Sequence, residues 1–254
     1  MKSWRLAAIG LCCYAVALLA FAPATLIDAS LDHATEGRLR LTEARGTIWS
    51  GAGLLDIRGP NRRSGIAKSV AWHIRLAYLL LGELRCEVEL DQTAKRFTVS
   101  VSPSRIDLAD ADINLPAAAL GLGVPKLAPL GLTGDVLLHI ARLSIGRDRI
   151  QGNASLQWNG AGSTFAPIAP LGDYELRLEG EGNTVSASLR TLQGPLQLDG
   201  RGSWTGGSNP EFSCSARVPP QHLQKLAPLL RMISVERGDG VFELQLKKND
   251  WANP

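Results

Sequence analysis

Most of this chain alternates apolar and polar residues with a period of two, the pattern that predicts β-strands with one buried face. In one such run, Cys86, Val88 and Leu90 alternate with Glu87 and Glu89. Further runs of the same kind are Leu39 and Leu41; Phe97, Val99 and Val101; Ile106 and Leu108; Val136, Leu138 and Ile140; Leu156 and Trp158; Tyr174, Leu176 and Leu178; Val185, Ala187 and Leu189; Leu196 and Leu198; Phe212, Cys214, Ala216 and Val218; and Phe242, Leu244 and Leu246. The alternation favours an antiparallel sheet that is solvated on one face.

Clusters of Gly, Asn, Asp and Pro separate the runs about every 8–12 residues, which predicts a meander with tight turns. These clusters are residues 51–53, 146–148, 180–183 and 206–210. The predicted fold class is mainly β: an antiparallel, curved β-meander, forming an open groove or a partly closed barrel. A break near residues 115–130 divides it into candidate sub-sheets 36–115 and 131–246. The lack of a long linker favours one continuous curved structure.

Helical patterns are few. Residues 115–122 and 221–232 are short amphipathic stretches, each entered through proline, and we expect one or two short helices there. Residues 74–81 fit a strand and a short helix equally well.

The N-terminus contains 22 residues without a charge, Leu6–Ile27. In a helix this run spans about 33 Å, enough to cross a bilayer core. Lys2 and Arg5 precede it and Asp28 follows it, which predicts a cytoplasmic N-terminus. The expected organisation is a cytoplasmic segment 1–5, a transmembrane anchor helix 6–27 and a periplasmic β domain 28–254, in a single-pass protein of the cell inner membrane.

A cleaved signal peptide is the alternative for the same segment, since Ala20-Phe21-Ala22 fits the small-x-small cleavage pattern. Pro23 would follow the cut and oppose cleavage, and the apolar run continues to Ile27. An uncleaved anchor is therefore favoured. Pro23 is expected to kink or restart the helix, which continues briefly through Leu31.

Charge and cysteine content narrow the possible partners. The formal net charge is +3, without a large basic cluster, so no nucleic acid partner is expected. Cys86 and Cys214 are in phase with the apolar positions of their strands. Two separately buried thiols are favoured, and a Cys86–Cys214 disulfide stays open because the periplasm permits it.

The sequence offers no recognisable catalytic machinery. Its four histidines do not adjoin a nucleophile motif, and no GxSxG occurs. Asp107, Asp110 and Asp112 resemble a solvated strand face more than a calcium loop. We expect no enzyme activity, with no catalytic, cofactor-binding or metal-binding residues and no cofactors.

Several segments carry a resemblance that physical reasoning alone would not provide: residues 23–28, 35–51, 79–84, 167–174, 194–198 and 221–230. The more specific ones are ARGTIWSG, residues 44–51, and PLGDYEL, residues 170–176. Together they resemble the type II secretion system protein N family (general secretion pathway protein N), in order over nearly the whole chain. Ala71-Trp72-His73 departs from the expected pattern. The resemblance implies an accessory inner-membrane component that helps to export folded proteins from the periplasm across the outer membrane.

Two functions from different classes follow. In the first, the chain is an interaction subunit that binds other type II secretion system subunits at the inner membrane. The candidate interaction or structural residues are Thr47, Trp49, Gly51, Leu171, Asp173 and Tyr174, for which a role in folding is the competing interpretation. In the second, the apolar faces line a groove and the chain is a periplasmic lipid-binding or lipid-transfer module. A continuous apolar trough would favour the second function, and a filled interior the first.

Overall fold

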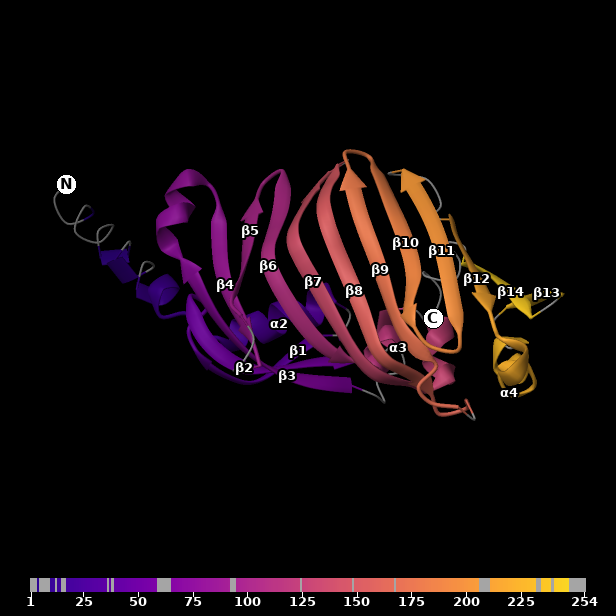
Figure 1. Ribbon diagram of the computed structural model, residues 1–254. Helices are drawn as coiled ribbons and strands as arrows, with labels where there is room; N and C mark the ends of the chain where they lie inside the picture. Colours follow the sequence, from indigo (N-terminus) through magenta and orange to yellow (C-terminus); the bar gives the residue numbers. More distant parts are fainter. Residues whose placement is uncertain are drawn as a thin grey trace. The chain divides into compact units, whose positions relative to one another are not determined.

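The structure is a computed structural model that describes residues 4, 10–11, 13–14, 17–35, 37, 39–58, 65–91, 95–123, 125–147, 149–166, 168–205, 211–231, 234–238 and 240–246 (Figure 1). The chain forms two compact units, residues 1–96 and 97–254. Both are mainly β, with antiparallel strands and short helices, which confirms the predicted class of fold.

The first unit contains four consecutive strands that pair in chain order. They are β1 (Leu39–Gly46), β2 (Ser50–Arg58), β3 (Gly65–Arg75) and β4 (Leu84–Leu90). Helix α2 (Thr25–Ala34) precedes them, and the 3-10 helix η1 (Leu76–Leu81) connects β3 to β4. The ambiguous stretch at 74–81 is thus the end of a strand followed by a short helix.

A small core holds α2 on this sheet. Ala24, Leu41 and Trp72 are buried together, and partly buried Ile27 and Leu31 of α2 pack against them. The alternation along β1 and β3 places Leu41 and Trp72 in this core, as period-two patterning requires. The core also accounts for α2, because the helix buries one apolar face there and leaves the other in solvent.

The N-terminal segment differs from a simple continuous helix. Residues 17–20 are helical, a turn follows at Phe21, and Pro23 forms a bridge with Thr47 before α2 begins at Thr25. The expected restart of the helix after Pro23 is therefore observed. Within the described residues, no helix is both long and apolar enough to cross a membrane. Residues 6–9, 12, 15 and 16 of the predicted anchor 6–27 lie outside that part of the chain.

The second unit is a longer meander with a linear strand order, so its sheet is not closed. Its strands are β5 (Phe97–Ser102), β6 (Arg105–Pro116), β7 (Leu132–Gly146), β8 (Ile150–Ser163), β9 (Gly172–Glu181), β10 (Thr184–Gln193), β11 (Gln197–Thr205), β12 (Glu211–Arg217), β13 (Val235–Gly238) and β14 (Val241–Leu246). Neighbours follow chain order from β5 to β12, and then β14 and β13 complete it. Figure 1 shows the long strands β6 to β10 bending along their length.

Short helices complete this unit: η2 (Ala117–Ala119), α3 (Leu120–Gly123), η3 (Pro125–Leu130) and α4 (Pro220–Arg231). Three of them, η2, α3 and α4, lie at the two stretches that the amphipathic pattern selected, whereas η3 forms in a proline-containing segment that was expected to be a connection only. The stretch 117–130, considered as a boundary between sub-sheets, connects β6 and β7, which pair along most of their length.

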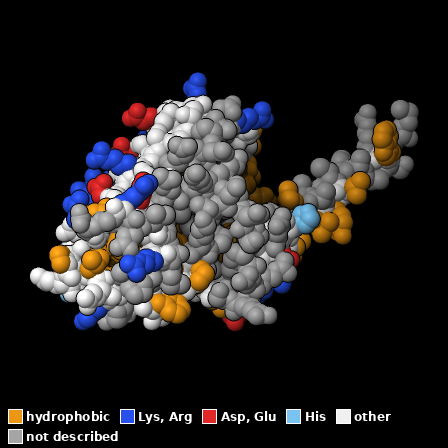
Figure 2. All heavy atoms as spheres, turned by 90° about the vertical axis from the view of Figure 1, so that its right-hand side faces the viewer, with side chains coloured by type: hydrophobic (Ala, Val, Ile, Leu, Met, Phe, Trp, Pro, Cys, Tyr) orange, Lys and Arg blue, Asp and Glu red, His pale blue; other side chains and the backbone are white. Residues whose placement is uncertain are grey.

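Cross-strand register confirms that the apolar sets share one face of this sheet. Leu138 pairs with Leu156, Leu156 with Leu176, and Leu176 with Leu189. A second row runs beside it through Ile140, Ala154, Leu178 and Ala187. The opposite face is polar. Figure 2, which views the molecule from the side of β12 to β14, shows Lys and Arg side chains interspersed with Asp and Glu side chains.

The best-filled core of the second unit lies under α4. Leu226 and Leu230 of the helix pack with Phe242 of β14 and Leu196 beside β11. Leu138, Leu156 and Leu176 are only half-buried, and they are not members of this core as the described residues define it. One apolar face therefore consists of a covered end and a more open middle.

One expected turn is wrong. Residues 51–53 do not end a run but lie inside β2, and the turn falls at residues 47–49. The glycine at 51 is required by a neighbouring ring, as described below. The expected turns at 146–148 and 180–183 are confirmed by their positions between β7 and β8 and between β9 and β10, whereas 206–210 lies outside the described residues.

Candidate functional site

The turn between β1 and β2 is where the N-terminal segment joins the sheet. Ile48 N donates a hydrogen bond to Ala22 O (3.0 Å), and Ala24 N donates to Gly46 O (3.2 Å). With the Pro23–Thr47 bridge between them, these bonds add the segment to the turn like a short extra strand. Backbone hydrogen bonds of this kind fix direction as well as position. We call residues 19–24 with residues 46–49 the junction.

Two tryptophans reinforce the junction. Trp49 Nε1 donates to Leu19 O at 2.8 Å, thereby satisfying a carbonyl near the end of the helical segment. Trp72 Nε1 donates to Ile48 O at 3.2 Å from inside the core of the first unit. Ile74 N donates to Trp49 O at 2.7 Å, which ties the turn to the end of β3.

Local contacts explain why threonine occupies position 47 and glycine occupies position 51. Thr47 Oγ1 accepts hydrogen bonds from Trp49 N and Ser50 N, both at 3.3 Å, as a turn-forming side chain does. A Cβ added to Gly51 would lie 2.5 Å from Trp72 Cζ2 and 2.4 Å from Arg45 O. Only glycine therefore allows the backbone of β2 to pass so close to the tryptophan ring.

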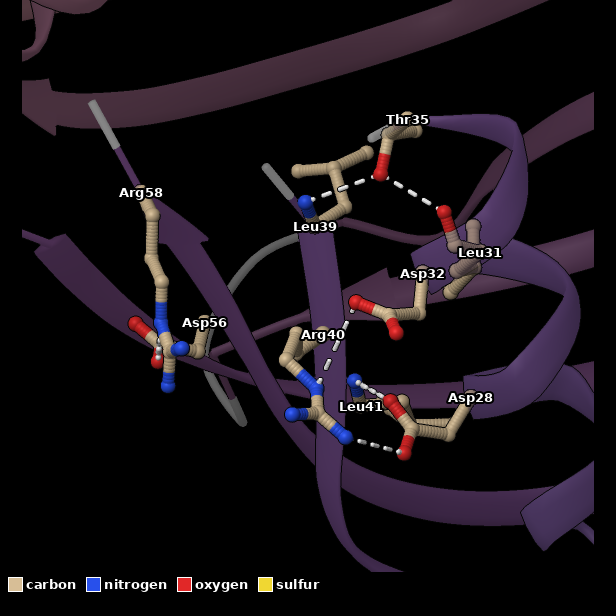
Figure 3. Close-up of polar contacts among 9 residues, drawn as sticks. All are labelled: Asp28, Leu31, Asp32, Thr35, Leu39, Arg40, Leu41, Asp56 and Arg58. Carbon is tan, nitrogen blue, oxygen red and sulfur yellow. Dashed lines mark hydrogen bonds and ion pairs between the residues drawn. The ribbon is translucent and has the colours of Figure 1, made fainter. Parts of the chain in front are cut away.

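Beside the junction, α2 covers the edge of β1 through polar contacts (Figure 3). Asp28 Oδ1 accepts a hydrogen bond from Leu41 N at 2.8 Å. Thr35 Oγ1 donates to Leu31 O and accepts from Leu39 N at 3.0 Å. Strand β1 pairs with β2 on its other side. The N–H groups of Leu39 and Leu41 are consequently occupied, and an added strand cannot use them.

Electrostatics act in the same direction. The hydrogen bond from Leu41 N, together with the hydrogen bond and charge of Arg40, lowers the pKa of Asp28 despite the opposing effect of burial. Arg40 lies 3.3 Å from Asp28 Oδ2 and 3.8 Å from Asp32 Oδ1, and this pairing raises the guanidinium pKa. Arg58 and Asp56 form a neighbouring pair at 2.7 Å on β2. These contacts need an ionised Asp28.

The other candidate residues lie in the second unit, where β8 gives way to β9. Leu171 is buried in the core under α4, and its carbonyl accepts from Leu196 N at 3.0 Å. Asp173 Oδ1 accepts from Gly160 N at 2.7 Å, and Gln193 donates to the other oxygen. These hydrogen bonds lower the pKa of Asp173. The contacts of Leu171 and Asp173 therefore stabilise the fold of this corner.

Tyr174 completes the same corner. Its hydroxyl donates to Leu196 O at 2.9 Å, and its ring centroid lies 5.9 Å from that of Trp158. The side chain is almost fully buried, and burial raises its pKa above the ordinary value. The structure thus places Thr47, Trp49 and Gly51 together in the first unit, and Leu171, Asp173 and Tyr174 together in the second.

Cys86 belongs to the first unit and Cys214 to the second. Cys86 on β4 is half-buried and Cys214 on β12 is buried, and both are free thiols in the structure. Burial raises the pKa of both, that of Cys214 to about 11. Low reactivity follows, because the thiolate is the reactive form.

Polar contacts on the outer face of the second unit include ion pairs within a strand and between neighbouring strands. Glu175 is buried between Arg177 and Arg190, which lower its pKa against the effect of burial. His139 Nδ1 lies 2.5 Å from Asp112 Oδ1 across β6 and β7, on the polar face that the alternation predicted for it. Among the described residues, no group of His, Cys, Asp and Glu could hold a metal ion.

Sequence reasoning missed two features of the first unit. One is the edge covering by Asp28 and Thr35, since an acidic residue after an apolar run was interpreted only as a topology signal. The other is the exposure of the leucines in η1, a stretch for which only the choice between strand and short helix had been considered. The available signal was Leu76–Leu81 itself, six residues without a polar group apart from the tyrosine hydroxyl.

These observations define a class: a mainly β protein whose open meander is joined by backbone hydrogen bonds to an apolar N-terminal segment. Comparison with protein families gives the particular assignment. The model of the family described as type II secretion system (T2SS), protein N, matches residues 37–245. The chain belongs to that family and is a component of type II secretion, associated with other components of the machinery. Neither curated proteins nor solved structures gave a match.

Proposed function

We propose that this chain is a non-enzymatic accessory subunit of the type II secretion system, held in the inner membrane by the apolar part of residues 6–27 that precedes the junction, whereas Ala24 and Ile27 pack in the core of the first unit. Its β units then lie in the periplasm and contact other subunits there. Family membership over residues 37–245 carries the proposal. The junction supports it, because hydrogen bonds from the sheet to Leu19 and Ala22 would hold the β structure in a defined orientation on its anchor.

Strand β13 is the surface that we assign to partner binding. It is a short strand at the end of the order in the second unit, and β14 is its neighbour in the described sheet. An outer strand of this kind can accept a partner strand through its backbone. In the first unit, by contrast, α2 occupies the equivalent groups of β1.

In-cell photocrosslinking tests this assignment. A photoreactive benzoylphenylalanine would replace Arg237, an exposed residue of β13, in a strain that secretes through this pathway. The matched control is the same group at Ser188, which is exposed in the interior strand β10. We expect a crosslink to another secretion subunit from position 237 and none from 188. Equal crosslinking from both positions, or from neither, would contradict the assignment.

The topology has its own test. Fusing a reporter that is active only in the periplasm to the C-terminus should give activity in cells, and deleting residues 6–27 should abolish it. Activity of a cytoplasm-specific reporter at the same place would overturn the membrane orientation. A gene deletion should in addition leave secreted substrates in the periplasm, and the intact chain should restore their export.

A lipid-binding function is the second candidate, and one observation favours it. The apolar face of β7 to β10 carries one row of half-buried leucines, Leu138, Leu156, Leu176 and Leu189, which are not part of the core under α4, whereas Ile140 and Ala187 of the next row are buried. Acyl chains would cover such a face at little cost, because it presents no charged side chain to them.

Neighbouring positions on β9 separate the two faces of this sheet. Leu178 belongs to the apolar face, whereas Glu179 is exposed on the other. A benzoylphenylalanine at 178, but not at 179, should crosslink to phospholipid in cells if this candidate is right. Equal or absent lipid labelling at the two positions would exclude it.

A further inference from the structure

The exposed 3-10 helix η1 connects β3 to β4 and is apolar throughout. It reads Leu-Ala-Tyr-Leu-Leu-Leu and contains no buried residue. Leu80 is 91% and Leu81 is 77% exposed, and Leu76 is half exposed. Soluble surfaces rarely carry so many adjacent large apolar side chains without a partner. The helix ends at Gly82, whose left-handed conformation returns the chain to β4.

The hydrogen bonds of Trp49 show where η1 lies relative to the N-terminal helical segment. Trp49 donates one hydrogen bond to Leu19 O in the helical segment and accepts another from Ile74 N. Ile74 is the penultimate residue of β3, and η1 begins two residues later, at Leu76. The apolar helix and the end of the N-terminal helical segment thus lie at the same end of this sheet.

The helical segment is apolar and exposed at that end too. Leu18, Leu19 and Phe21 each expose more than half of their surface, and Phe21 exposes 79%. They belong to the uncharged run Leu6–Ile27. Two exposed apolar elements that are separate in sequence therefore lie at the same end of this sheet.

The base of η1 has the composition of a lipid interface. Arg85 stacks on the ring of Tyr78, with its Cζ 4.0 Å from the ring centroid, and Arg75 lies directly before the helix. Tyrosine and arginine favour the headgroup layer, where the ring and the stem are partly apolar and the polar ends stay wet. The leucines then extend beyond this polar base, as in other interfacial insertions.

We infer that η1 is a membrane-inserting element: its leucines enter the periplasmic leaflet of the same bilayer that holds residues 6–27, with Tyr78 and Arg85 at the headgroups. The inference rests on the membrane placement proposed above. A bilayer is favoured over a protein groove because η1 lies at the same end of the sheet as the exposed, uncharged N-terminal segment that is proposed to enter the membrane. Two contacts with the membrane would restrict the tilt of the first unit relative to the bilayer.

Depth-dependent fluorescence quenching tests it on the full-length chain reconstituted in phosphatidylcholine–phosphatidylglycerol vesicles. Cys12 and Cys13 are replaced by serine, and a single cysteine is introduced as Leu80→Cys and labelled with the fluorophore NBD. Lipids with a doxyl group on the acyl chain supply the quencher. The native thiols, half-buried Cys86 and buried Cys214, are controlled by labelling the parent without an introduced cysteine.

Two further positions make the result decisive. Leu11→Cys reports whether the N-terminal run is in the bilayer. Ala67→Cys is exposed at the far part of β3, eight residues before Arg75 and thus about 26 Å away along the strand. We expect at least a twofold quenching at positions 11 and 80 and little at 67.

Each outcome has one meaning. Quenching at 11 without quenching at 80 overturns the inserting role of η1 and leaves the anchor intact. Absence of quenching at 11 overturns the membrane placement and the inference with it. Equal quenching at 80 and 67 shows non-specific adsorption and also overturns it. Vesicles contain no other protein, so a requirement for a partner's transmembrane helix would give the first of these results.

Discussion

The indole Nε1 of Trp49 donates a hydrogen bond to the carbonyl oxygen of Leu19 at 2.8 Å, across 30 positions of sequence. This contact connects the helical N-terminal segment to the turn of the first hairpin. The same turn also pairs with Ala22 and Ala24 through backbone atoms. The sheet is therefore not tethered through a free linker but is bonded to the segment that precedes it.

Replacing Trp49 by phenylalanine should loosen the junction without unfolding the sheet. The ring is retained but the donor is lost, which typically costs about 0.5–1.5 kcal/mol. We expect faster hydrogen exchange at the amides of Ala22 and Ala24 in the detergent-solubilised full chain, with unchanged exchange in β9. The matched variant Trp204→Phe, on β11 of the second unit, should leave the junction amides as they were. Identical exchange in the wild type and Trp49→Phe would contradict this account.

Gly51→Ala should destabilise the first unit. Its Cβ would meet the ring of Trp72 and the carbonyl of Arg45, both well inside van der Waals contact, and overpacking of this kind costs about 1–3 kcal/mol. Urea unfolding followed by tryptophan fluorescence measures the change. Gly146→Ala is the control, since its nearest neighbours would be 3.5 Å away. A cost at 146 equal to that at 51 would show that the ring contact is not the cause.

The contact between α2 and β1 should depend on pH. The folded state lowers the pKa of Asp28 below its ordinary value of 3.8, so the ionised form is favoured in the folded protein. The contribution to stability is full above that value and is lost as pH falls through the lower folded pKa. Asp28→Asn should remove this part of the acid dependence in urea unfolding measured from pH 6 to pH 2.5. Asp32→Asn is the matched control on the same helix, because it leaves the hydrogen bond from Leu41 N to Asp28 in place.

Tyr174→Phe should destabilise the second unit, because the buried carbonyl of Leu196 would lose its donor. The expected loss is about 1–2 kcal/mol in the free energy of unfolding. Tyr78→Phe, on the exposed η1, serves as the matched control and should change it by less than about 0.5 kcal/mol. An equally small effect at both positions would mean that water replaces the lost donor.

Cys86 and Cys214 should both be reduced and should react slowly with alkylating reagents. With a pKa of about 11 instead of 9.0, Cys214 holds about 100-fold less thiolate at neutral pH. Iodoacetamide should modify Cys214 only after denaturation, as followed by intact mass. Non-reducing denaturation that leaves Cys86 and Cys214 unmodified would instead demonstrate a disulfide between them.

The sequence allowed the strands and their faces to be predicted because alternation is a local property. Leu138, Leu156 and Leu176 pair across neighbouring strands and so lie on one face, as the alternation predicted. The edge covering of β1 could not be predicted, since it depends on Asp28 accepting a hydrogen bond from a backbone N–H thirteen residues later in the sequence. Residues 51–53 were misjudged for a related reason: glycine marks both turns and close approaches, and only the position of Trp72 distinguishes them.

The open side of β13 also limits how many partners can bind. A single four-residue strand offers room for one added strand, and the β1 side of the first unit, with its N–H groups already bonded to α2, offers none at residues 39–41. Assembly through this strand alone is therefore restricted to a one-to-one complex or a closed two-fold dimer of the chain with itself. An open-ended filament would require a second binding surface, so mass photometry of the solubilised protein should show discrete species and no ladder.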